Sequence, residues 1–310
     1  MELELYQIVI LIIAGGIVGI SMSFIGQTGS GIVIPIVFIL TGDILLAIAI
    51  NILNDLIAAS VCSIYYLIKK NYIFTKDNFI LIAVSALTSL LCVYILITTN
   101  LSSSFSILLP LVFIIGGLYV FKNGFPTAAS IKETVHKITE KFLKNKKSED
   151  EIKEIEKKMD QQLLEGENIT EGLIKRYSKP FYIATIIVGI ILGGNSGLFG
   201  ASGGLIIVLA LIIISGYPLK KSVGTGLVVS AVICLCTFTI YQIFGTIIKG
   251  RTYFDLTISF YLAIGAISVG IISSIYVQKL SAKAMGMGMG TIMVILGIAT
   301  LIIHFVNIQI

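Results

Sequence analysis

The sequence predicts an all-α, polytopic integral membrane protein with two inverted-topology repeats, broken or half helices within each repeat, and a soluble helical linker between them. Three observations lead to this prediction. The 310 residues are 56% hydrophobic and only 13% charged, with a mean hydropathy of +1.00, whereas soluble proteins carry about 25% charged residues. More than half of the charged side chains lie between residues 122 and 179. Long apolar runs fill the rest of the chain, and the second half repeats their order.

The first repeat is predicted to cover residues 1–121. A membrane-spanning helix needs about 20 mostly apolar residues, and a first run of this kind extends over residues 6–24. It has neither a basic leader nor a cleavage site, so we expect a retained helix rather than a signal peptide. A polar, glycine-rich break over residues 26–31 precedes a run at 32–41 that is long enough only for a half helix. Fuller spans are expected over 44–68, 79–98 and 105–121.

Residues 122–179 are predicted to form a charged cytoplasmic linker that contains an amphipathic helix. Residues 148–151 read Ser-Glu-Asp-Glu, which matches a capping box, and apolar residues then recur at helical spacing up to Leu163. We interpret this segment as a connector between the two membrane repeats.

The second repeat, residues 180–310, has the same order of elements. Apolar runs over 181–198 and 205–215 flank a break at 200–204, and further spans are expected over 219–244, 254–277 and 284–305. A constant shift of 174 positions aligns the halves without a gap and pairs Gly19 with Gly193, Gly26 with Gly200, Thr28 with Ser202, Gly29 with Gly203, and Cys62 with Cys236. This register predicts an internal duplication. Each half contains five passes, or three passes and a re-entrant hairpin, and an odd number inverts the second copy.

The basic residues outside the linker predict the orientation. Lysines are enriched on the cytoplasmic side of membrane proteins, and one arrangement places the linker there together with Lys69, Lys70, Lys76, Lys220, Lys221, Lys279 and Lys283. Both termini then lie outside the cytoplasmic membrane of the cell. Lys249 and Arg251 fall on the opposite side and are exceptions to the rule.

Two half helices that start in mid-membrane from opposite sides would aim their N-termini at each other. A helix N-terminus offers unpaired N–H groups and a partial positive charge, and glycine lets an anion approach the backbone. The expected substrate-binding residues are Gln27, Thr28, Gly29 and Ser30, then Ala201, Ser202, Gly203 and Gly204, and the repeat-equivalent polar residues Asn51 and Thr225. The alternative is that these small and polar residues only allow helices to pack and to hydrogen-bond to each other.

Asp55 is the one carboxylate deep in a predicted span, one helical turn after Asn51. A buried ionisable residue in a membrane is a functional hypothesis by default, so Asp55 and its neighbour Asn54 are the expected site of proton or sodium coupling. Pairing of Asp55 with a lysine at a helix or subunit interface is the alternative. The repeat equivalent of Asp55 is Val229, so the feature is asymmetric.

No catalytic residues, metal site or cofactor are expected, and the chain is not predicted to be an enzyme. Residues 26–31 lack the Gly-Lys-Ser/Thr ending of a phosphate loop. Cys234 and Cys236 lie two residues apart on a predicted helix, point about 200° away from each other, and cannot chelate one ion together. The basic residues are dispersed among acidic ones, which does not favour a nucleic-acid partner.

The paired loops resemble those of the sulfite exporter TauE/SafE family of membrane permeases, which are also grouped as toluene sulfonate uptake permeases. The family signature is a Gly-x-Gly-Gly-Gly loop, then proline after four apolar residues, then a stretch like Ala-Val-Gly-Thr-Ser. The first copy corresponds to residues 26–30 with Pro35 and to residues 49–51. The second corresponds to 200–204, with Leu209 in place of proline, and to 223–227. Thr28 and Ser30 replace glycines of the family pattern.

The resemblance implies transport of a small sulfur-containing anion, such as sulfite or an organosulfonate, across the cytoplasmic membrane. With the inverted repeats, we expect a secondary transporter in which the halves rock about one central site. Two alternatives remain: an anion channel of the same architecture, and a membrane receptor or scaffold that acts through the linker. The expected partners are the anion, a coupling proton or sodium ion and the lipid bilayer, and homodimerisation is left open.

Overall fold

The computed structural model describes residues 3–26, 29–99, 118, 179–215, 217, 219–277, 279–280, 291, 294–295 and 298. All regular structure in these ranges is helical, and six of the described helices are long and apolar enough to cross a membrane. The predicted polytopic all-α class is therefore confirmed. The linker and the spans expected over 105–121 and 284–305 lie almost entirely outside the described residues.

The described helices fall into two groups of four. The first half contributes α1 (Leu5–Ile25), α2 (Ser30–Thr41), α3 (Ile44–Ile68) and α4 (Lys76–Thr99), and the second contributes α8 (Lys179–Phe199), α9 (Gly204–Ile213), α10 (Leu219–Lys249) and α11 (Leu256–Val277). Their bounds lie within a few residues of the expected ones, except that α10 continues past its expected end to Lys249. The half helices α2 and α9 contain 12 and 10 residues.

Local sequence explains where α1 and α2 end and where α3 begins. Gly26 ends α1 and Gly42 ends α2, each in the left-handed region, with φ of 69° and 67°. Glycine adopts this conformation without the steric cost that a Cβ would bring. Asp43 then starts α3, where its side chain accepts hydrogen bonds from the backbone N–H groups of Leu45 and Leu46.

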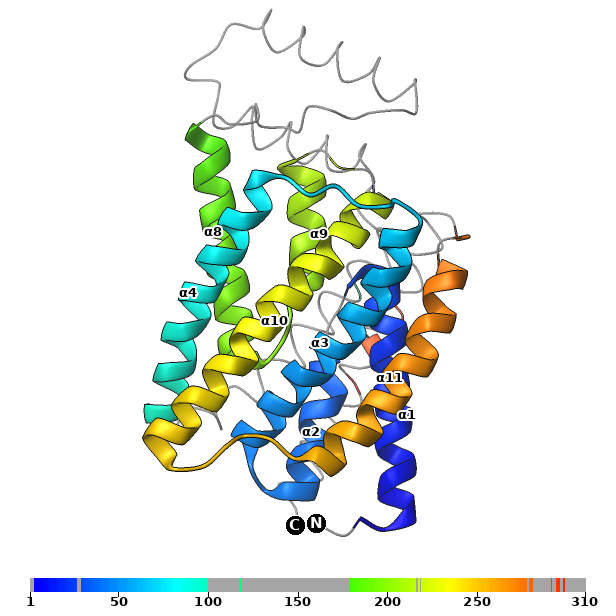
Figure 1. The fold of residues 1–310 in the computed structure, drawn as a ribbon, viewed down its shortest axis with the longest axis vertical. Helices are drawn as coiled ribbons and strands as arrows, with labels where there is room; N and C mark the ends of the chain where they lie inside the picture. The colour runs from blue at the N-terminus through cyan, green and yellow to red at the C-terminus, as the bar shows by residue number, and fades with distance from the viewer. Residues whose placement is uncertain are drawn as a thin grey trace, which may run out of the picture.

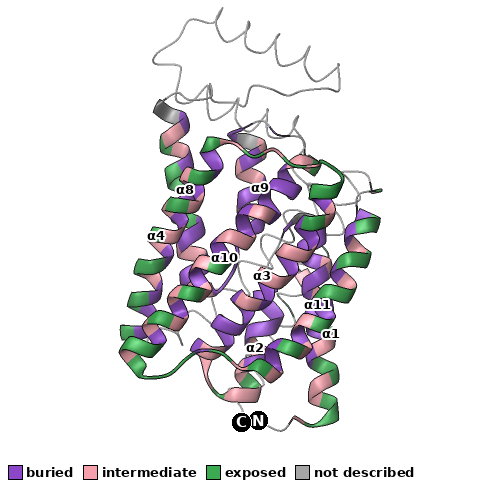
Figure 2. Cartoon of the chain, viewed as in Figure 1, coloured by how far each residue is buried: buried purple, intermediate pink, exposed green. Residues whose placement is uncertain are grey.

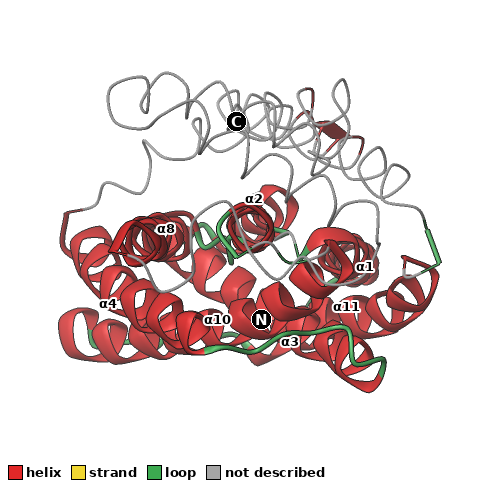
Figure 3. Cartoon of the chain, turned by 90° about the horizontal axis from the view of Figure 1, so that it is seen from above, coloured by secondary structure: helices red, strands yellow, loops and turns green. Residues whose placement is uncertain are grey.

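The two hairpins enter the bundle from opposite ends (Figure 1). The α1–α2 hairpin comes from the lower end of the view and α8–α9 from the upper end, so that α2 and α9 run in opposite directions with their N-termini near the middle. Seen from above (Figure 3), α8, α2 and α1 form one layer, and α4, α10, α3 and α11 form another. The hairpins thus have the opposed orientation expected of an inverted repeat. The duplication itself stays a prediction.

The longest helix contacts join the two halves. Helix α1 packs along α11, and α4 packs along α8. A Cβ on Gly19 would come within 2.6 Å of the Ala266 carbonyl oxygen, and one on Gly193 would overlap the carbonyl oxygen of Ser85. These glycines therefore bring the helix backbones into direct contact, as small residues do in membrane bundles.

Burial divides the helices into an inward and an outward face (Figure 2). Buried and exposed residues lie on different sides of the same helices, and many large apolar side chains are exposed. Leu91 on α4 and Ile187 on α8 are more than half exposed. Exposed apolar side chains on helices long enough to span a bilayer are suited to contact with lipid chains.

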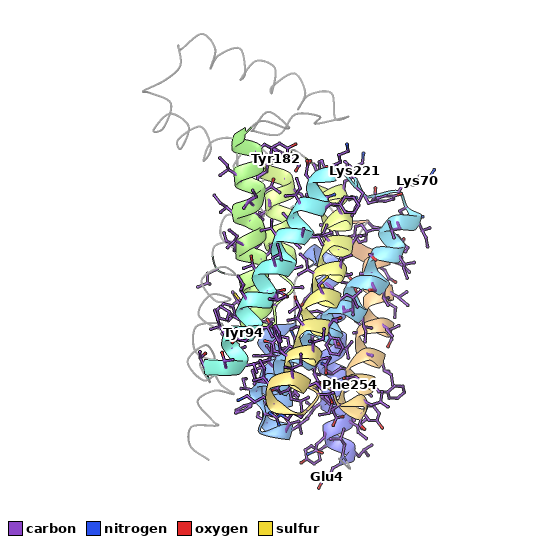
Figure 4. The ribbon with its side chains drawn as sticks, turned by 60° about the vertical axis from the view of Figure 1, so that its left-hand side comes forward. Glu4, Lys70, Tyr94, Tyr182, Lys221 and Phe254 are labelled. Atoms are coloured by element: carbon purple, nitrogen blue, oxygen red, sulfur yellow. The ribbon has the colours of Figure 1, made fainter. Side chains whose placement is uncertain are left out.

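Several charged residues lie at the two ends of the bundle (Figure 4). Lys70 and Lys221 lie near the upper end, and Glu4 lies at the lower end. Arg251, an exception to the orientation rule, forms an ion pair with Asp43, with 2.7 Å between Nη2 and Oδ2. Its positive charge is therefore balanced within the protein. Which side of the membrane each end faces stays a prediction.

Candidate functional site

The two glycine-rich loops meet in the middle of the bundle. The carbonyl oxygen of Gly26, at the end of α1, approaches Gly204 so closely that a Cβ on Gly204 would overlap it. Gly29 is the N-cap of α2, and Gly203, with φ of 68°, is the N-cap of α9. The N-termini of both half helices therefore border one junction, which we define by the described residues 26, 29–30 and 200–204. Gln27 and Thr28 lie outside the described residues.

One carboxylate bridges the two loops of the junction. The Oδ1 atom of Asp55 accepts a hydrogen bond from the backbone N–H of Gly29 (3.2 Å), and its Oδ2 atom accepts one from the N–H of Ser202 (3.4 Å). Asp55 is completely buried. The partial positive charge of a helix N-terminus stabilises a negative group. The position that the sequence predicted for an anion is therefore held by a side chain of the protein.

Asn51 lies one turn before Asp55 on α3 and faces the same junction. Its Nδ2 atom donates a hydrogen bond of 2.6 Å to the carbonyl oxygen of Gly200. This carbonyl follows the last residue of α8, where intrahelical partners run out. Asn51 therefore fastens the second loop to α3, so that α3 contacts both loops.

Two buried side chains near the junction have no hydrogen-bond partner among the described residues. These are the Oγ atom of Ser202 and the amide of Asn54, of which neither Oδ1 nor Nδ2 is paired. Nearly all buried polar atoms of folded proteins are hydrogen-bonded, so an unpaired hydroxyl beside two helix N-termini leaves a donor for a bound group. Ser30, another expected site residue, is buried in the first turn of α2.

The glycines of the loops are closely surrounded. A Cβ on Gly29 would overlap the side chain of Val18, and one on Gly203 would strike Leu192. Ala201 is buried, and its carbonyl oxygen accepts a hydrogen bond from Asn195 (3.2 Å). The junction is thus closely packed, and backbone N–H and C=O groups make its hydrogen bonds to Asp55, Asn51 and Asn195.

Thr225, the repeat equivalent of Asn51, has a different environment. Its hydroxyl donates to the carbonyl oxygen of Ile73 (3.0 Å) and accepts from the Ile73 N–H (2.9 Å). These bonds tie the first part of α10 to the connection between α3 and α4. Among the residues that the structure describes, Asn51 hydrogen-bonds to a loop of the junction and Thr225 does not.

Each end of the bundle has a polar contact between the two halves. At the lower end, Asp43 before α3 pairs with Arg251 before α11. At the other end, Tyr217 before α10 forms a 3.1 Å hydrogen bond with the Thr75 hydroxyl before α4. Asp43 and Tyr217 are equivalent in the 174-position register. The two contacts thus join corresponding connections at opposite ends of the molecule.

The described residues offer little for metal chemistry. Among them, no group of three His, Cys, Asp or Glu side chains could hold a metal ion. The four cysteines are free thiols. Cys62 lies 3.3 Å from the Ser23 hydroxyl, which also contacts the hydroxyls of Ser273 and Ser274 on α11. This cluster connects α1, α3 and α11.

Comparisons with curated proteins and with solved structures give no match. The sequence model of the family described as sulfite exporter TauE/SafE matches residues 11–300, a range that includes both hairpins and the helices that follow them. The match covers nearly the whole chain, so the protein belongs to the sulfite exporter TauE/SafE family.

Proposed function

We propose that the protein is a secondary transporter of a small sulfur-containing anion, sulfite or an organosulfonate, that binds at the junction of the two half helices. Membership of the TauE/SafE family implies transport of a sulfur anion across a membrane. The six apolar helices are consistent with such a protein. Backbone amides and hydroxyl groups would bind the anion without any lysine or arginine.

The observation that supports this binding position most directly is the bridge made by Asp55. Its two oxygens take hydrogen bonds from Gly29 and Ser202, which belong to the loops of opposite half helices. A sulfite or sulfonate group also presents several negatively charged oxygens, and it can accept from the same N–H donors. Ser30, Ser202 and Thr28 would add hydroxyl donors, and Asn51 would hold the second loop in place.

Alternating access would expose this junction first to one end of the bundle and then to the other. The contacts at the two ends, Asp43 with Arg251 and Tyr217 with Thr75, lie where such openings would have to form. We assign the coupling ion, a proton or sodium, to Asp55, with the buried amide of Asn54 beside it. A charged group inside a membrane protein is costly and commonly serves such a role.

Thermal unfolding of the purified protein tests the proposal with a panel of sulfite, sulfate, thiosulfate, short sulfonates and carboxylates. A ligand at 100 times its Kd adds about 2.7 kcal/mol to the stability of the folded state. We expect a sulfur anion to stabilise the wild type and Gly203→Leu to lose this response. Gly42→Leu is the matched control, because Gly42 has the same positive φ but no neighbour within 4 Å. A wild type that no anion stabilises would contradict the proposal.

Two further experiments separate the alternatives. In vesicles, a channel would pass anions much faster than a carrier and would not depend on a second ion. Deletion of residues 127–170 should leave anion binding intact in a transporter, whereas a scaffold that acts through its linker would lose its function.

A further inference from the structure

We propose that Asp55 is a built-in competitor of the transported anion. The carboxylate accepts hydrogen bonds from the amides of both half-helix loops. The substrate takes these amides only when Asp55 accepts a proton and withdraws. This inference rests on the proposed function and adds its coupling: one proton travels with each anion.

The hydrogen bonds at the junction mean that the substrate must compete with Asp55 for the same N–H donors. A backbone N–H has one hydrogen to donate. The N–H of Gly29 is directed to one oxygen of Asp55, and the N–H of Ser202 to the other. A substrate oxygen that accepts from either amide therefore takes it from the carboxylate.

Packing makes addition of the substrate beside the carboxylate unfavourable. Gly26 and Gly204 are already in contact, Val18 lies against Gly29, and Leu192 lies against Gly203. No side chain as small as a methyl group fits at Gly204, Gly29 or Gly203 without displacement of these neighbours. An anion of several heavy atoms would therefore have to replace the carboxylate at the amides.

Charge explains why the replacement needs a proton. Two unit negative charges about 4 Å apart repel each other enough, at an effective dielectric constant of about 20, to weaken binding about 1,000-fold. The two helix N-termini supply one shared positive potential, which cannot fully stabilise the Asp55 carboxylate and the substrate anion at the same time. Neutralisation of Asp55 removes the repulsion, and carboxylate pairs that share one site take up a proton for the same reason.

The elements around Asp55 carry few other groups that titrate. Helices α2 and α9 have no titratable side chain, and α1 has only Tyr6, at its outer end. On α10, the thiol of Cys234 is buried and lies close enough to Asp55 for an electrostatic interaction. The tyrosines of α11 are half-buried or exposed, and Cys62 lies two turns further along α3. Within the described residues, no other carboxylate hydrogen-bonds to either loop, so Asp55 is the group expected to carry the proton.

The proposed cycle conserves atoms and charge. On the side where substrate enters, the Asp55 carboxylate takes one proton from water and becomes a neutral acid, and the two N–H groups then donate to substrate oxygens. On the other side, the substrate leaves, Asp55 releases its proton to water, and the carboxylate returns to the amides. A monovalent sulfonate and its proton cross together and carry no net charge.

The experiment uses a short alkyl sulfonate such as ethanesulfonate, because its own charge does not change between acidic and neutral pH. Isothermal titration with the full chain should show that the Kd of the wild type rises about tenfold per pH unit over the range where Asp55 is ionised. Asp55→Asn keeps the size of the side chain and removes its charge. Its Kd should equal the acidic limit of the wild type at every pH.

Transport in proteoliposomes provides the second measurement. A pH gradient should drive accumulation of the sulfonate by the wild type, and an imposed voltage should have no effect. Asp55→Asn should not respond to the gradient but should still exchange labelled for unlabelled sulfonate. Asp255→Asn is the matched control, because Asp255 caps α11 through the N–H of Ile258, far from the junction, and asparagine caps a helix equally well. It should behave as the wild type.

The outcomes separate the two proposals. If the sulfonate binds and Gly203→Leu abolishes binding, but the wild-type Kd is independent of pH, the competition is overturned and the proposed function stands. If a sodium gradient drives uptake in place of the pH gradient, the assignment of a proton as the coupling ion is overturned, whereas the binding site is not. If no sulfur anion binds at any pH, the proposed function itself fails. Should Asp55→Asn not fold, the pH dependence and voltage independence of the wild type decide the question alone.

Discussion

Replacement of Gly204 by alanine should separate the two half-helix loops. The new Cβ would overlap the carbonyl oxygen of Gly26. Both partners of this clash are backbone, so no flexible side chain can turn away to relieve it. The loops must move apart by about 2 Å before the contact becomes an ordinary one.

The distances at Asp55 set the size of the effect. Its hydrogen bonds to Gly29 and Ser202 are already 3.2 and 3.4 Å long, and hydrogen bonds weaken sharply beyond this range. A shift of the loops should therefore leave only one amide within reach of a bridging anion. Loss of one hydrogen bond to a charged group costs about 1.5–3 kcal/mol, which corresponds to a Kd about 10- to 150-fold higher.

Titration calorimetry with a sulfonate measures this loss, and thermal unfolding in detergent shows whether Gly204→Ala remains folded. Gly194→Ala is the control, because a Cβ on Gly194 meets nothing within 4 Å and alanine favours the helix. The control should bind as the wild type does and be equally or slightly more stable. Wild-type affinity in Gly204→Ala would refute the view that contact between the loops shapes the binding site.

Three further predictions concern stability and use thermal unfolding. Gly193→Ala should cost about 1–3 kcal/mol because the methyl group meets the backbone of α4; its neighbour Gly194→Ala should not, and equal stability of the two variants would be inconsistent with the packing. Asn51→Leu should cost about 1–3 kcal/mol because the carbonyl after α8 loses its buried donor; an unchanged unfolding temperature would argue against that bond. Arg251→Gln should cost less than about 1 kcal/mol and even less at high salt, because its ion pair with Asp43 is half-exposed; a large loss would show that the pair acts as a buried one.

Most of the fold could be predicted from the sequence because bilayer thickness and backbone hydrogen bonding dictate the lengths of apolar runs. The span expected over 44–68 is the observed α3, and the glycines at 26 and 42 end α1 and α2 where the sequence predicts breaks. The end of α10 was missed because the helix continues to Lys249 after its apolar run has ended. The last residues of α10 need only helical backbone conformation and hydrogen bonding to continue the helix, and apolar side chains are not required for this.

The sequence indicated which two loops and which residues of the span over 44–68 to consider as a candidate site, but not the contacts that they make. Sequence spacing placed Asn51 and Asp55 on one face of α3, yet only the tertiary arrangement shows that the carboxylate bridges both loops. Equivalence within the repeat assigned Thr225 the role of Asn51. The shorter hydroxyl of threonine instead bonds to the nearby backbone of Ile73, whereas the longer amide of asparagine reaches a loop of the other half.

The close helix contacts at Gly19 and Gly193 restrict how the protein can change shape. Gly19 holds α1 against the backbone of α11, and Gly193 holds α8 against that of α4. Each contact joins the first helix of one half to a helix of the other half. If either half rotated as a rigid body, both the α1–α11 contact and the α4–α8 contact would be broken. A motion that preserves these contacts must move α1 together with α11 and α4 together with α8. The bodies that shift during a transport cycle would then each contain pieces of both halves of the chain.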